Sequence, residues 1–544
     1  MSKKKLLFII PPYFDIEDFL TKKEISSLPV FTIPYGILSM EAYINHKVKK
    51  NVNIELLDLN ILAYMIVKDK PKKNIKEIHT NLMTLISDKL DNSVKIVGIS
   101  TLFNNAYNYL KDITTTIKSV ENPPLCVVGG GLASNLYKTI LNDFPLIDAI
   151  CYAEGEVPMA DLLNANNYKI LLNEHPAWIT KQNLKNGKIP KAYYIENLDE
   201  IPMFDYGLID LKNYNGRAMD KRFCNDKIKR ELSIHTSRGC PFKCVYCANI
   251  ALHGRKVRFM SVQRVISEVD NMIEKFGMNV LLIEDDHFLA DKKRAAEILK
   301  ELSSRNIRIE FPNGIAVYAI DEEIGFLLKK AGVTTIQLAV ESGSEYVLKK
   351  LINKPLKTSK IPEVVNILRK NNIIIHAFIV LGIPGEMDEH RQETLEMIKK
   401  VGFDWVYFFI AIPVAGSRLY DICITNDYLV NKDFSHHITS KGAIKAPGVD
   451  PEKIEKASYL MNLEVNFINN FNVLSGFFDK ALPYFFNISE KYPGHAFAHY
   501  ILSNIFREKK EFELSNKHYN IYTKLINENN IWKSYAEYFK LEFK

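Results

Sequence analysis

The chain has 544 residues, more than one hydrophobic core usually supports, so two or three domains are expected. Hydrophobic residues make up 47% and charged residues 25%, which excludes a collagen-like or wholly disordered chain. The net charge of +7 is small for this length and no run of five like charges occurs, so nucleic acid is not an expected partner. No apolar run approaches the roughly 18 residues that span a bilayer, so a cytoplasmic protein without membrane contact is expected.

Residues 1–165 alternate short apolar runs with stretches of helical spacing. The expected strands are Leu6–Ile10, Asn53–Leu57, Lys95–Ser100, Leu125–Val128 and Ala149–Tyr152. This alternation predicts a doubly wound, Rossmann-like parallel sheet, the first part of an α/β protein. Ligands of such sheets bind beyond the carboxyl ends of the strands.

A second alternating region begins after residues 166–230, which are polar, weakly periodic and expected to form a linker. Its expected strands are Leu232–Thr236, Val280–Glu284, Ile307–Phe311, Thr335–Val340, Ile373–Leu381 and Trp405–Ile412. Six strand–helix repeats over residues 231–430 predict a partial (β/α)6 barrel, with functional residues at the carboxyl ends of its strands.

The last region, residues 450–544, is expected to be all-α. A 34-residue echo relates Ala481, Phe485 and Pro493 to Ser515, Tyr519 and Asn527, as in the small, aromatic and helix-breaking positions of a tetratricopeptide (TPR) repeat. Any two helical hairpins can give this spacing by chance, so the sequence predicts a TPR-like helical tail and leaves its repeat type open. Such a tail could dock a protein partner.

Three cysteines, Cys240, Cys244 and Cys247, follow the first expected barrel strand with the spacing C-x3-C-x2-C. Soft thiolate ligands select zinc or iron–sulfur clusters. A structural zinc site closes with four protein ligands, and Cys224 or His253 could supply the fourth. Three thiolates on a four-iron cluster instead leave one iron open to a substrate.

The cysteine loop resembles that of the radical S-adenosylmethionine (SAM) superfamily, and later motifs of residues 230–430 follow in the family's order. These motifs are Glu284–Asp286, Glu341–Ser344, Gly382–Glu386 and Pro413–Ser417. The resemblance implies a 4Fe-4S cluster on the three cysteines and a bound SAM. The SAM-binding residues it implies are Tyr246, Glu284, Asp285, Glu341, Ser342, Gly382 and Pro384. Each motif also has a plainer interpretation as a solvated turn, a helix cap or a packing contact.

The N-terminal motifs resemble the cobalamin-binding domain that precedes the barrel in one large radical SAM subfamily. The cobalamin-binding residues this implies are Pro12, Ser100, Thr101, Gly129, Gly130, Gly131, Gly155 and Glu156. Glycines at 129–131 would let the backbone approach a bulky planar ligand. The D-x-H-x-x-G motif, which supplies an axial histidine in other cobalamin proteins, is absent, as it commonly is in this subfamily.

The resemblance therefore implies a cobalamin-dependent radical SAM methyltransferase acting on carbon or phosphorus in a small metabolite or a peptide. A reductant protein such as flavodoxin or ferredoxin would be a partner. The alternative is a cyclase, rearrangement or oxidative enzyme of the same architecture, without net methyl transfer. A third interpretation, a binding module built on the helical tail, does not explain three thiolates at cluster spacing.

Four further residues lie near the expected strand ends. Arg238, Tyr318 and Tyr407 are expected to face the barrel pocket, whereas His376 is expected to be an ordinary barrel residue. The sequence specifies neither the substrate nor the catalytic acid–base residues, and it leaves the oligomeric state open.

Overall fold

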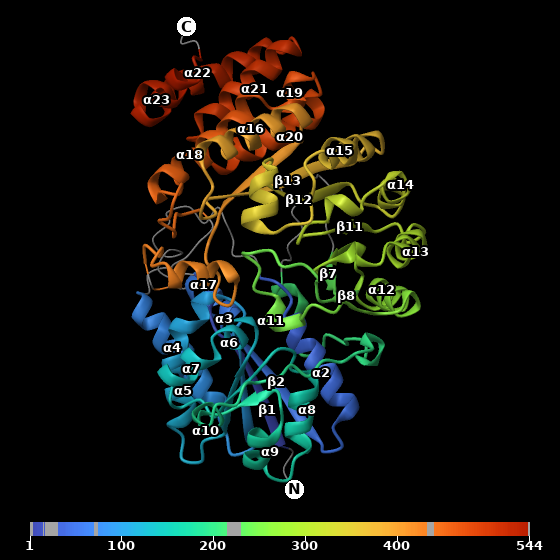
Figure 1. The fold of residues 1–544 in the computed structure, drawn as a ribbon, viewed down its shortest axis with the longest axis vertical. Coiled ribbons are helices and arrows are strands. Elements are labelled where there is room, and N and C mark those ends of the chain that lie inside the picture. The colour runs from blue at the N-terminus through green and yellow to red at the C-terminus, as the bar shows by residue number, and fades with distance from the viewer. Residues whose placement is uncertain are drawn as a thin grey trace.

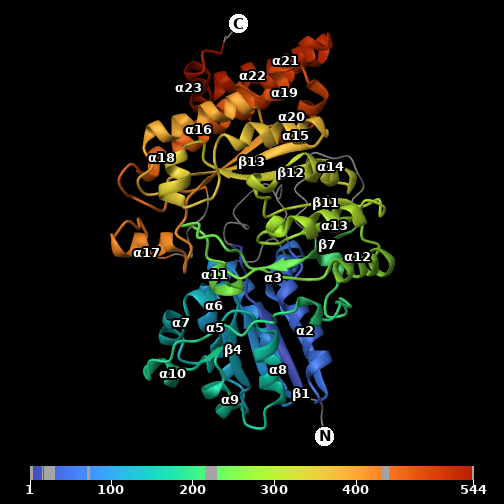
Figure 2. The same ribbon diagram turned by 45° about the vertical axis from the view of Figure 1, so that its right-hand side comes forward.

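The protein divides along its long axis into an α/β part, a barrel and a helical end (Figure 1, Figure 2). The computed structural model describes residues 4–14, 16, 31–69, 74–214, 230–431, 433 and 440–541. Cys224, considered above as a zinc ligand, lies outside the described residues.

A six-stranded sheet of order β2-β1-β3-β4-β5-β6 forms the N-terminal part. Its strands are β1 (Lys4–Ile10), β2 (Val52–Asp58), β3 (Val94–Ser100), β4 (Leu125–Gly129), β5 (Ala149–Cys151) and β6 (Trp178–Ile179). The first five are parallel, and the chain winds in both directions from β1, which confirms the predicted doubly wound sheet. Antiparallel β6 lies inside the segment expected to be a linker. The sequence did not predict this strand, because two residues are too few to show a periodic pattern.

Helices cover both faces of this sheet (Figure 1). One face carries α2 (Tyr35–Lys47), α8 (Glu156–Asn164) and α9 (Tyr168–Glu174), and the other carries α3 (Leu59–Asp69), α4 (Ile75–Lys89), α5 (Tyr107–Lys118) and α7 (Tyr137–Asp143). Two short helices complete this part, α6 (Gly131–Asn135) and α10 (Lys181–Lys185). Since side chains alternate along a strand, Leu6 and Phe8 of β1 pack on the first face and Leu7 and Ile9 on the second. Burial on both faces explains why these strands read as continuous apolar runs.

The barrel contains the six predicted parallel strands in chain order. They are β7 (Glu231–Ile234), β10 (Val280–Ile283), β11 (Arg308–Glu310), β12 (Thr335–Glu341), β13 (Ile374–Leu381) and β14 (Trp405–Ile410). They form two three-stranded sheets, which a parallel bridge between Ile315 and Leu338 joins into one partial barrel.

Helices on the outside of the barrel follow the first five of its six strands. They are α12 (Val262–Phe276), α13 (Lys292–Leu302), α14 (Glu322–Lys330), α15 (Lys360–Lys370) and α16 (Asp388–Val401). In α12, the Ser261 side chain accepts from the Arg264 N–H and left-handed Gly277 ends the helix, so local sequence sets both ends. Shorter elements near the barrel mouth are β8 (Ser237–Arg238), α11 (Ile250–His253), β9 (Arg258–Phe259) and α17 (Arg418–Thr425).

The C-terminal region is helical, as predicted. Its helices are α18 (Pro451–Leu463), α19 (Phe471–Leu474), α20 (Phe478–Lys491), α21 (Ala496–Glu508), α22 (Phe512–Glu528) and α23 (Asn530–Tyr538). Helices α20 and α22 begin 34 residues apart, and so do α21 and α23. Pro493 lies between α20 and α21, but Asn527 lies within α22, so its predicted role as a helix breaker is wrong. The side chain of Asn529 instead caps α23.

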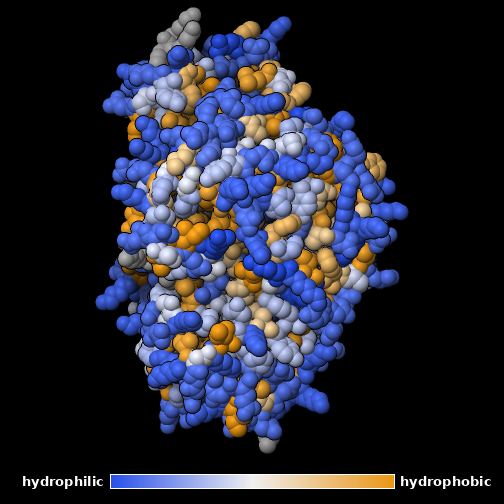
Figure 3. All heavy atoms as spheres, in the orientation of Figure 1, coloured by the Kyte–Doolittle hydropathy of each residue, from blue (hydrophilic) through white to orange (hydrophobic). Residues whose placement is uncertain are grey.

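Hydrophilic side chains dominate the face shown in Figure 3, with apolar side chains scattered among them. Isolated apolar side chains of this kind are ordinary on a folded protein. Among the described residues, no helix is both long enough and apolar enough to cross a membrane.

Candidate functional site

The three cysteines lie on a loop that leaves β8 at the mouth of the barrel. The base of the loop is closed by a hydrogen bond from the Cys240 N–H to the Gly254 carbonyl, at 3.3 Å. Gly239, just before the loop, has a φ of 97°, and a Cβ there would lie 2.4 Å from the Lys256 carbonyl oxygen. Only glycine fits at this position, because both the backbone conformation and the close approach exclude a side chain.

A charged pair stands beside the thiols. The Lys354 ammonium lies 3.0 Å from the Glu341 carboxylate, and both side chains are largely buried. Tyr246 is hydrogen-bonded to the same carboxylate, so two of the predicted SAM-binding residues come together here. Burial raises the pKa of the Cys244 thiol, and the nearby charge of Lys354 opposes that rise.

The arrangement of donors favours a cluster over a single ion. Within the ranges that the structure describes, no three His, Cys, Asp or Glu side chains converge on a position for one metal ion. His253, considered above as a zinc ligand, donates from Nδ1 to Glu154 Oε1 at 2.8 Å. A four-iron cluster takes its thiolates at separate corners, which suits three cysteines on one open loop.

The acidic turn after β10 directs its carboxylates to opposite sides. Glu284 and Asp286 line the main cavity of the protein, and Asp285 does not. Both oxygens of Asp285 are occupied, one by the Thr236 N–H and the other by the hydroxyls of Thr236 and Ser237, each at 2.6 Å. Burial raises the pKa of Asp285 to about 6. Asp285 therefore holds the chain that leads into the cysteine loop rather than facing a ligand.

Asp286 lines the cavity but was left out of the predicted SAM-binding residues, although the acidic motif Glu284–Asp286 includes it. Its carboxylate accepts hydrogen bonds from the Asn249 amide at 2.7 Å and from the Gly239 N–H at 3.3 Å. Side chains alternate in an extended segment, so Asp286 faces the same side as Glu284, which lies two residues earlier. This alternation was the sequence signal that could have identified Asp286.

The remaining predicted SAM-binding residues shape turns. Ser342 is buried, with its hydroxyl 3.1 Å from the Thr394 hydroxyl. Gly382 has a φ of 84° and donates its N–H to Glu386 at 2.5 Å, which locks the turn that also contains Pro384. Burial raises the pKa of Glu386 to about 7. None of the three predicted residues lines the main cavity.

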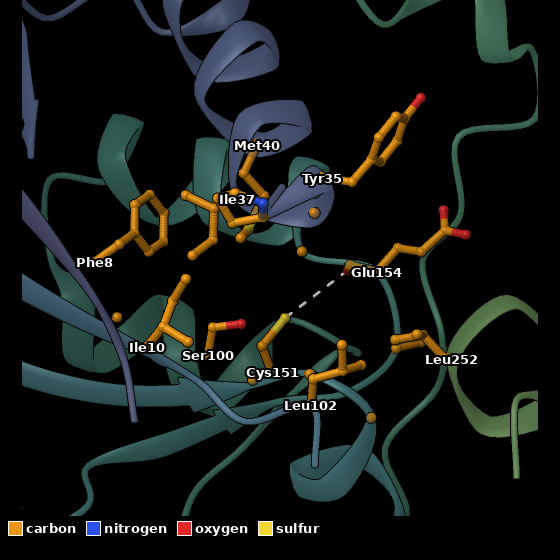
Figure 4. Close-up of a pocket in the computed structure, with 18 of the residues that line it drawn as sticks. Phe8, Ile10, Tyr35, Ile37, Met40, Ser100, Leu102, Cys151, Glu154 and Leu252 are labelled. Carbon is orange, nitrogen blue, oxygen red and sulfur yellow. Dashed lines mark hydrogen bonds between the residues drawn. The ribbon is translucent and has the colours of Figure 1, made fainter. Parts of the chain in front are cut away.

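That cavity has a volume of about 470 Å³ and opens at the carboxyl ends of β1, β3, β4 and β5. Figure 4 shows its mainly apolar wall, built by side chains that include Phe8, Ile10, Ile37, Met40 and Leu102. The position is the switch point of the doubly wound sheet, where such sheets bind ligands.

Most of the predicted cobalamin-binding residues line this cavity. They are Ser100, Gly129, Gly130, Gly131, Gly155 and Glu156. Pro12 and Thr101 are buried behind it. A Cβ on Gly130 would lie 2.5 Å from the Thr101 carbonyl oxygen, so the glycine turn is packed directly on the end of β3.

The same cavity continues to the barrel mouth, where its lining includes His235, Asn249, Leu252, Glu284 and Asp286. One continuous space therefore joins the carboxyl edge of the N-terminal sheet to the residues around the cysteine loop. This connection was not visible in the sequence, because its two halves come from separate segments, before residue 180 and after residue 230.

Two of the four further residues, Arg238 and His376, lie as expected. Arg238 lines the cavity. Tyr318 does not line it, and its hydroxyl lies 2.5 Å from His287 Nε2, beside Phe242 of the cysteine loop. His376 is fully buried, with Nε2 2.7 Å from the Tyr484 hydroxyl. Tyr407 contacts the His376 ring and does not line the cavity, so the expectation that it faces the pocket is not met.

Residues 234–398, which include most of the barrel, match the Radical SAM superfamily. An uncharacterized methyltransferase of Pyrococcus horikoshii is 26% identical over 404 residues, which cover 74% of this chain and 85% of the relative. Cytidylyl-2-hydroxyethylphosphonate methyltransferase of Streptomyces wedmorensis is 27% identical over 401 residues, which cover 68% of this chain and 74% of the relative. The solved structure of the cobalamin-dependent SAM radical enzyme OxsB shares the fold, with a TM-score of 0.58, 16% identity and coverage of 99% and 81% of the two chains.

Proposed function

We propose that this protein is a cobalamin-dependent radical SAM methyltransferase. The observation that carries the proposal is the single cavity that runs from the switch point of the N-terminal sheet to the mouth of the barrel. Two cofactor sites on separate domains can act on one substrate only if they share such a space. The names of the two relatives, both methyltransferases, and the cobalamin and SAM bound to OxsB support the same function.

The residues of this chain fit the cofactors that the function requires. The thiols of Cys240, Cys244 and Cys247 would hold the 4Fe-4S cluster, and Lys354 places a positive charge beside them. Tyr246 lies within the cysteine loop and is hydrogen-bonded to Glu341, and both would contact SAM there. When bound, these cofactors supply one-electron cleavage of SAM and methyl transfer.

The N-terminal residues contribute shape rather than a metal ligand. The glycines 129–131 keep the carboxyl edge of β4 free of side chains, so a planar corrin could approach the backbone there. The apolar part of the wall would limit water around a substrate held between the sheet and the barrel, which would protect reactive species from quenching. We propose a small metabolite or a peptide as substrate, and a flavodoxin or ferredoxin as electron donor.

Anaerobic reconstitution with iron, sulfide and hydroxocobalamin tests the proposal. We expect iron–sulfur absorbance, a corrin spectrum that survives desalting, and formation of 5′-deoxyadenosine and S-adenosylhomocysteine. In Cys244→Ala, the cluster absorbance and 5′-deoxyadenosine should be lost while corrin is retained. Cys126→Ala is the matched control, because Cys126 is buried in β4 away from the loop.

The products separate the proposed function from its alternative. Retained corrin with S-adenosylhomocysteine indicates methyl transfer. Formation of 5′-deoxyadenosine without S-adenosylhomocysteine would instead indicate a cyclase, rearrangement or oxidative enzyme. Uptake of zinc in place of iron, or full turnover by Cys244→Ala, would overturn the radical SAM mechanism itself.

A further inference from the structure

Glu154 lies in the turn that follows β5, and its backbone lines the cavity. The turn is tightly held: Ala153 has a φ of 69°, and its N–H donates to the Ser134 hydroxyl at 3.0 Å. Figure 4 shows the Glu154 carboxylate directed away from the cavity wall, toward the neighbouring loop of the barrel. The backbone of Glu154 is therefore part of the N-terminal domain, whereas its side chain contacts residues of the barrel.

The carboxylate holds the chain that follows the cysteine loop. Arg258 donates to it from both terminal nitrogens, at 2.9 and 2.5 Å, and His253 donates from Nδ1 at 2.8 Å. Arg258 is 2% exposed and Glu154 4%, so this two-pronged pair is screened from water. Both partners lie within about ten residues of Cys247 in the chain.

The same carboxylate also holds the chain that precedes the loop. Arg238 Nη1 lies 3.3 Å from Glu154 Oε2 and 2.8 Å from Glu156 Oε1, and all three side chains are 4% exposed. The Ser39 hydroxyl completes this side by donating to Glu156 at 2.6 Å. Burial raises the pKa of Glu154, but Arg238, His253 and Arg258 outweigh it and hold the pKa well below its usual range.

We propose that Glu154 is a positioning residue that couples the cavity to the cysteine loop. The Glu154 carboxylate contacts the chain on both sides of the cysteine loop. The base of this loop is closed by the hydrogen bond between Cys240 and Gly254. A shift of the turn after β5 must therefore move both flanks together. The inference rests on the proposed function. We call the contacts of Glu154 with Arg238, His253 and Arg258 the Glu154 clamp. Corrin binding in the cavity and cluster formation on the loop each order this clamp, so each of the two events favours the other.

A thermodynamic cycle tests the coupling. The affinity for hydroxocobalamin is measured on protein with and without the reconstituted cluster, for the native chain and for Glu154→Gln. In the native chain the cluster should tighten corrin binding by at least about fivefold, the lower end of ordinary coupling. In Glu154→Gln both ligands should still bind, but the change should fall to less than about twofold.

Two further variants separate coupling from simple loss of stability. Asp404→Asn removes another buried carboxylate of the barrel, one that accepts from the Ile375 N–H and the Asn472 amide on the side facing the tail. It should lower stability yet keep the native coupling. Arg258→Lys keeps the charge but loses the two-pronged contact, and should give intermediate coupling even if Glu154→Gln does not fold.

The Mössbauer spectrum of the oxidised, iron-57-labelled cluster gives a readout independent of turnover. Adding hydroxocobalamin should change this spectrum in the native chain and in Asp404→Asn, but not in Glu154→Gln. Native coupling in Glu154→Gln, or none in the native chain, would overturn the inference. Failure of the native chain to retain corrin at all would instead contradict the proposed function.

Discussion

The barrel is joined to its two neighbours by opposite kinds of chemistry. On the cysteine-loop side, the junction with the N-terminal sheet contains a cluster of buried ions, chiefly Arg238, Arg258, Glu154 and Glu156, in addition to the apolar core that the two parts share. On the other side, the junction with the tail is aromatic: Trp405 of β14 stacks on Tyr484 of α20 at a centroid distance of 5.2 Å.

The two junctions contribute differently to the orientation of the domains and to the stability of the fold. Buried ion pairs add little net stability, because desolvation offsets their attraction, but their directional hydrogen bonds fix how two parts meet. Apolar burial is the larger stabilising contribution and is less directional. The ionic junction lies beside the candidate site, where orientation matters, and the apolar junction lies away from it.

The tail also completes the barrel sheet. The Asn466 amide accepts from the Val406 N–H at 2.9 Å and donates to the Val406 carbonyl at 2.7 Å, so it pairs with the free edge of β14 as a further strand would. Removal of residues 450–544 would expose this edge. Docking of a protein partner through the tail stays a prediction. Because deletion of the tail would also disturb the barrel, this prediction is best tested by a surface substitution such as Phe512→Ser, at a side chain that is 61% exposed.

The largest effect is expected from Arg238→Met. The change leaves Glu154 and Glu156 without their shared partner in a buried site, and breaking a buried pair in this way costs about 3–5 kcal/mol. Thermal unfolding and corrin retention should both deteriorate, since the same residue sets stability and orientation. Stability within about 1 kcal/mol of the native chain would mean that the ions are not tightly coupled.

A smaller and purely structural effect is expected from Phe485→Ala. Phe485 is fully buried in the tail junction, and truncating such a ring usually costs about 3 kcal/mol or more. Corrin retention and the cluster spectrum should nevertheless be native at temperatures where the variant is folded. Loss of either cofactor from the folded variant would contradict the division between the two junctions.

The fold could be predicted from the sequence because its signals are local. The barrel strands were each placed within a few residues, since buried β-branched runs between helical stretches are clear patterns. The sequence does not predict strand β6, because Trp178–Ile179 is too short to show alternation and is defined by its pairing with β5.

The site was predictable only where a motif lies on one short segment. The cysteine loop is such a segment, and the glycines 129–131 do line the cavity. The Glu154 clamp was not foreseen, because Arg238 and Arg258 are more than 80 residues away in the chain and no periodic pattern links them. At the acidic turn 284–286, alternation alone separates Asp285 from Glu284 and Asp286, but only the structure shows that the last two face the cavity.

Acid should separate the two junctions. His495 stacks on Phe467, and its Nδ1 accepts the capping hydrogen bond from the Ala498 N–H, so the neutral ring is required. Burial lowers the pKa of His495 to about 4, below its ordinary value near 6.5. Its contribution to tail stability is therefore complete above about pH 6.5 and is lost as the pH falls toward 4, by about 2 kcal/mol at pH 5. Glu154 stays ionised over this range, because its pKa is lowered.

Hydrogen-exchange protection factors measured at pH 7.5 and pH 5 would resolve this difference element by element. Protection in α20 and α21 should fall about thirtyfold at pH 5, since about 2 kcal/mol corresponds to that factor, while β5 and the cysteine loop keep theirs. His495→Asn is the matched variant, because asparagine caps a helix equally well but does not titrate. Its tail should lose less protection on acidification than the native tail, and the loss that remains belongs to His499 and His518, whose pKa burial also lowers. An equal loss in His495→Asn would assign the acid sensitivity to another group, and an equal loss in β5 would show that the two junctions respond to acid as one unit.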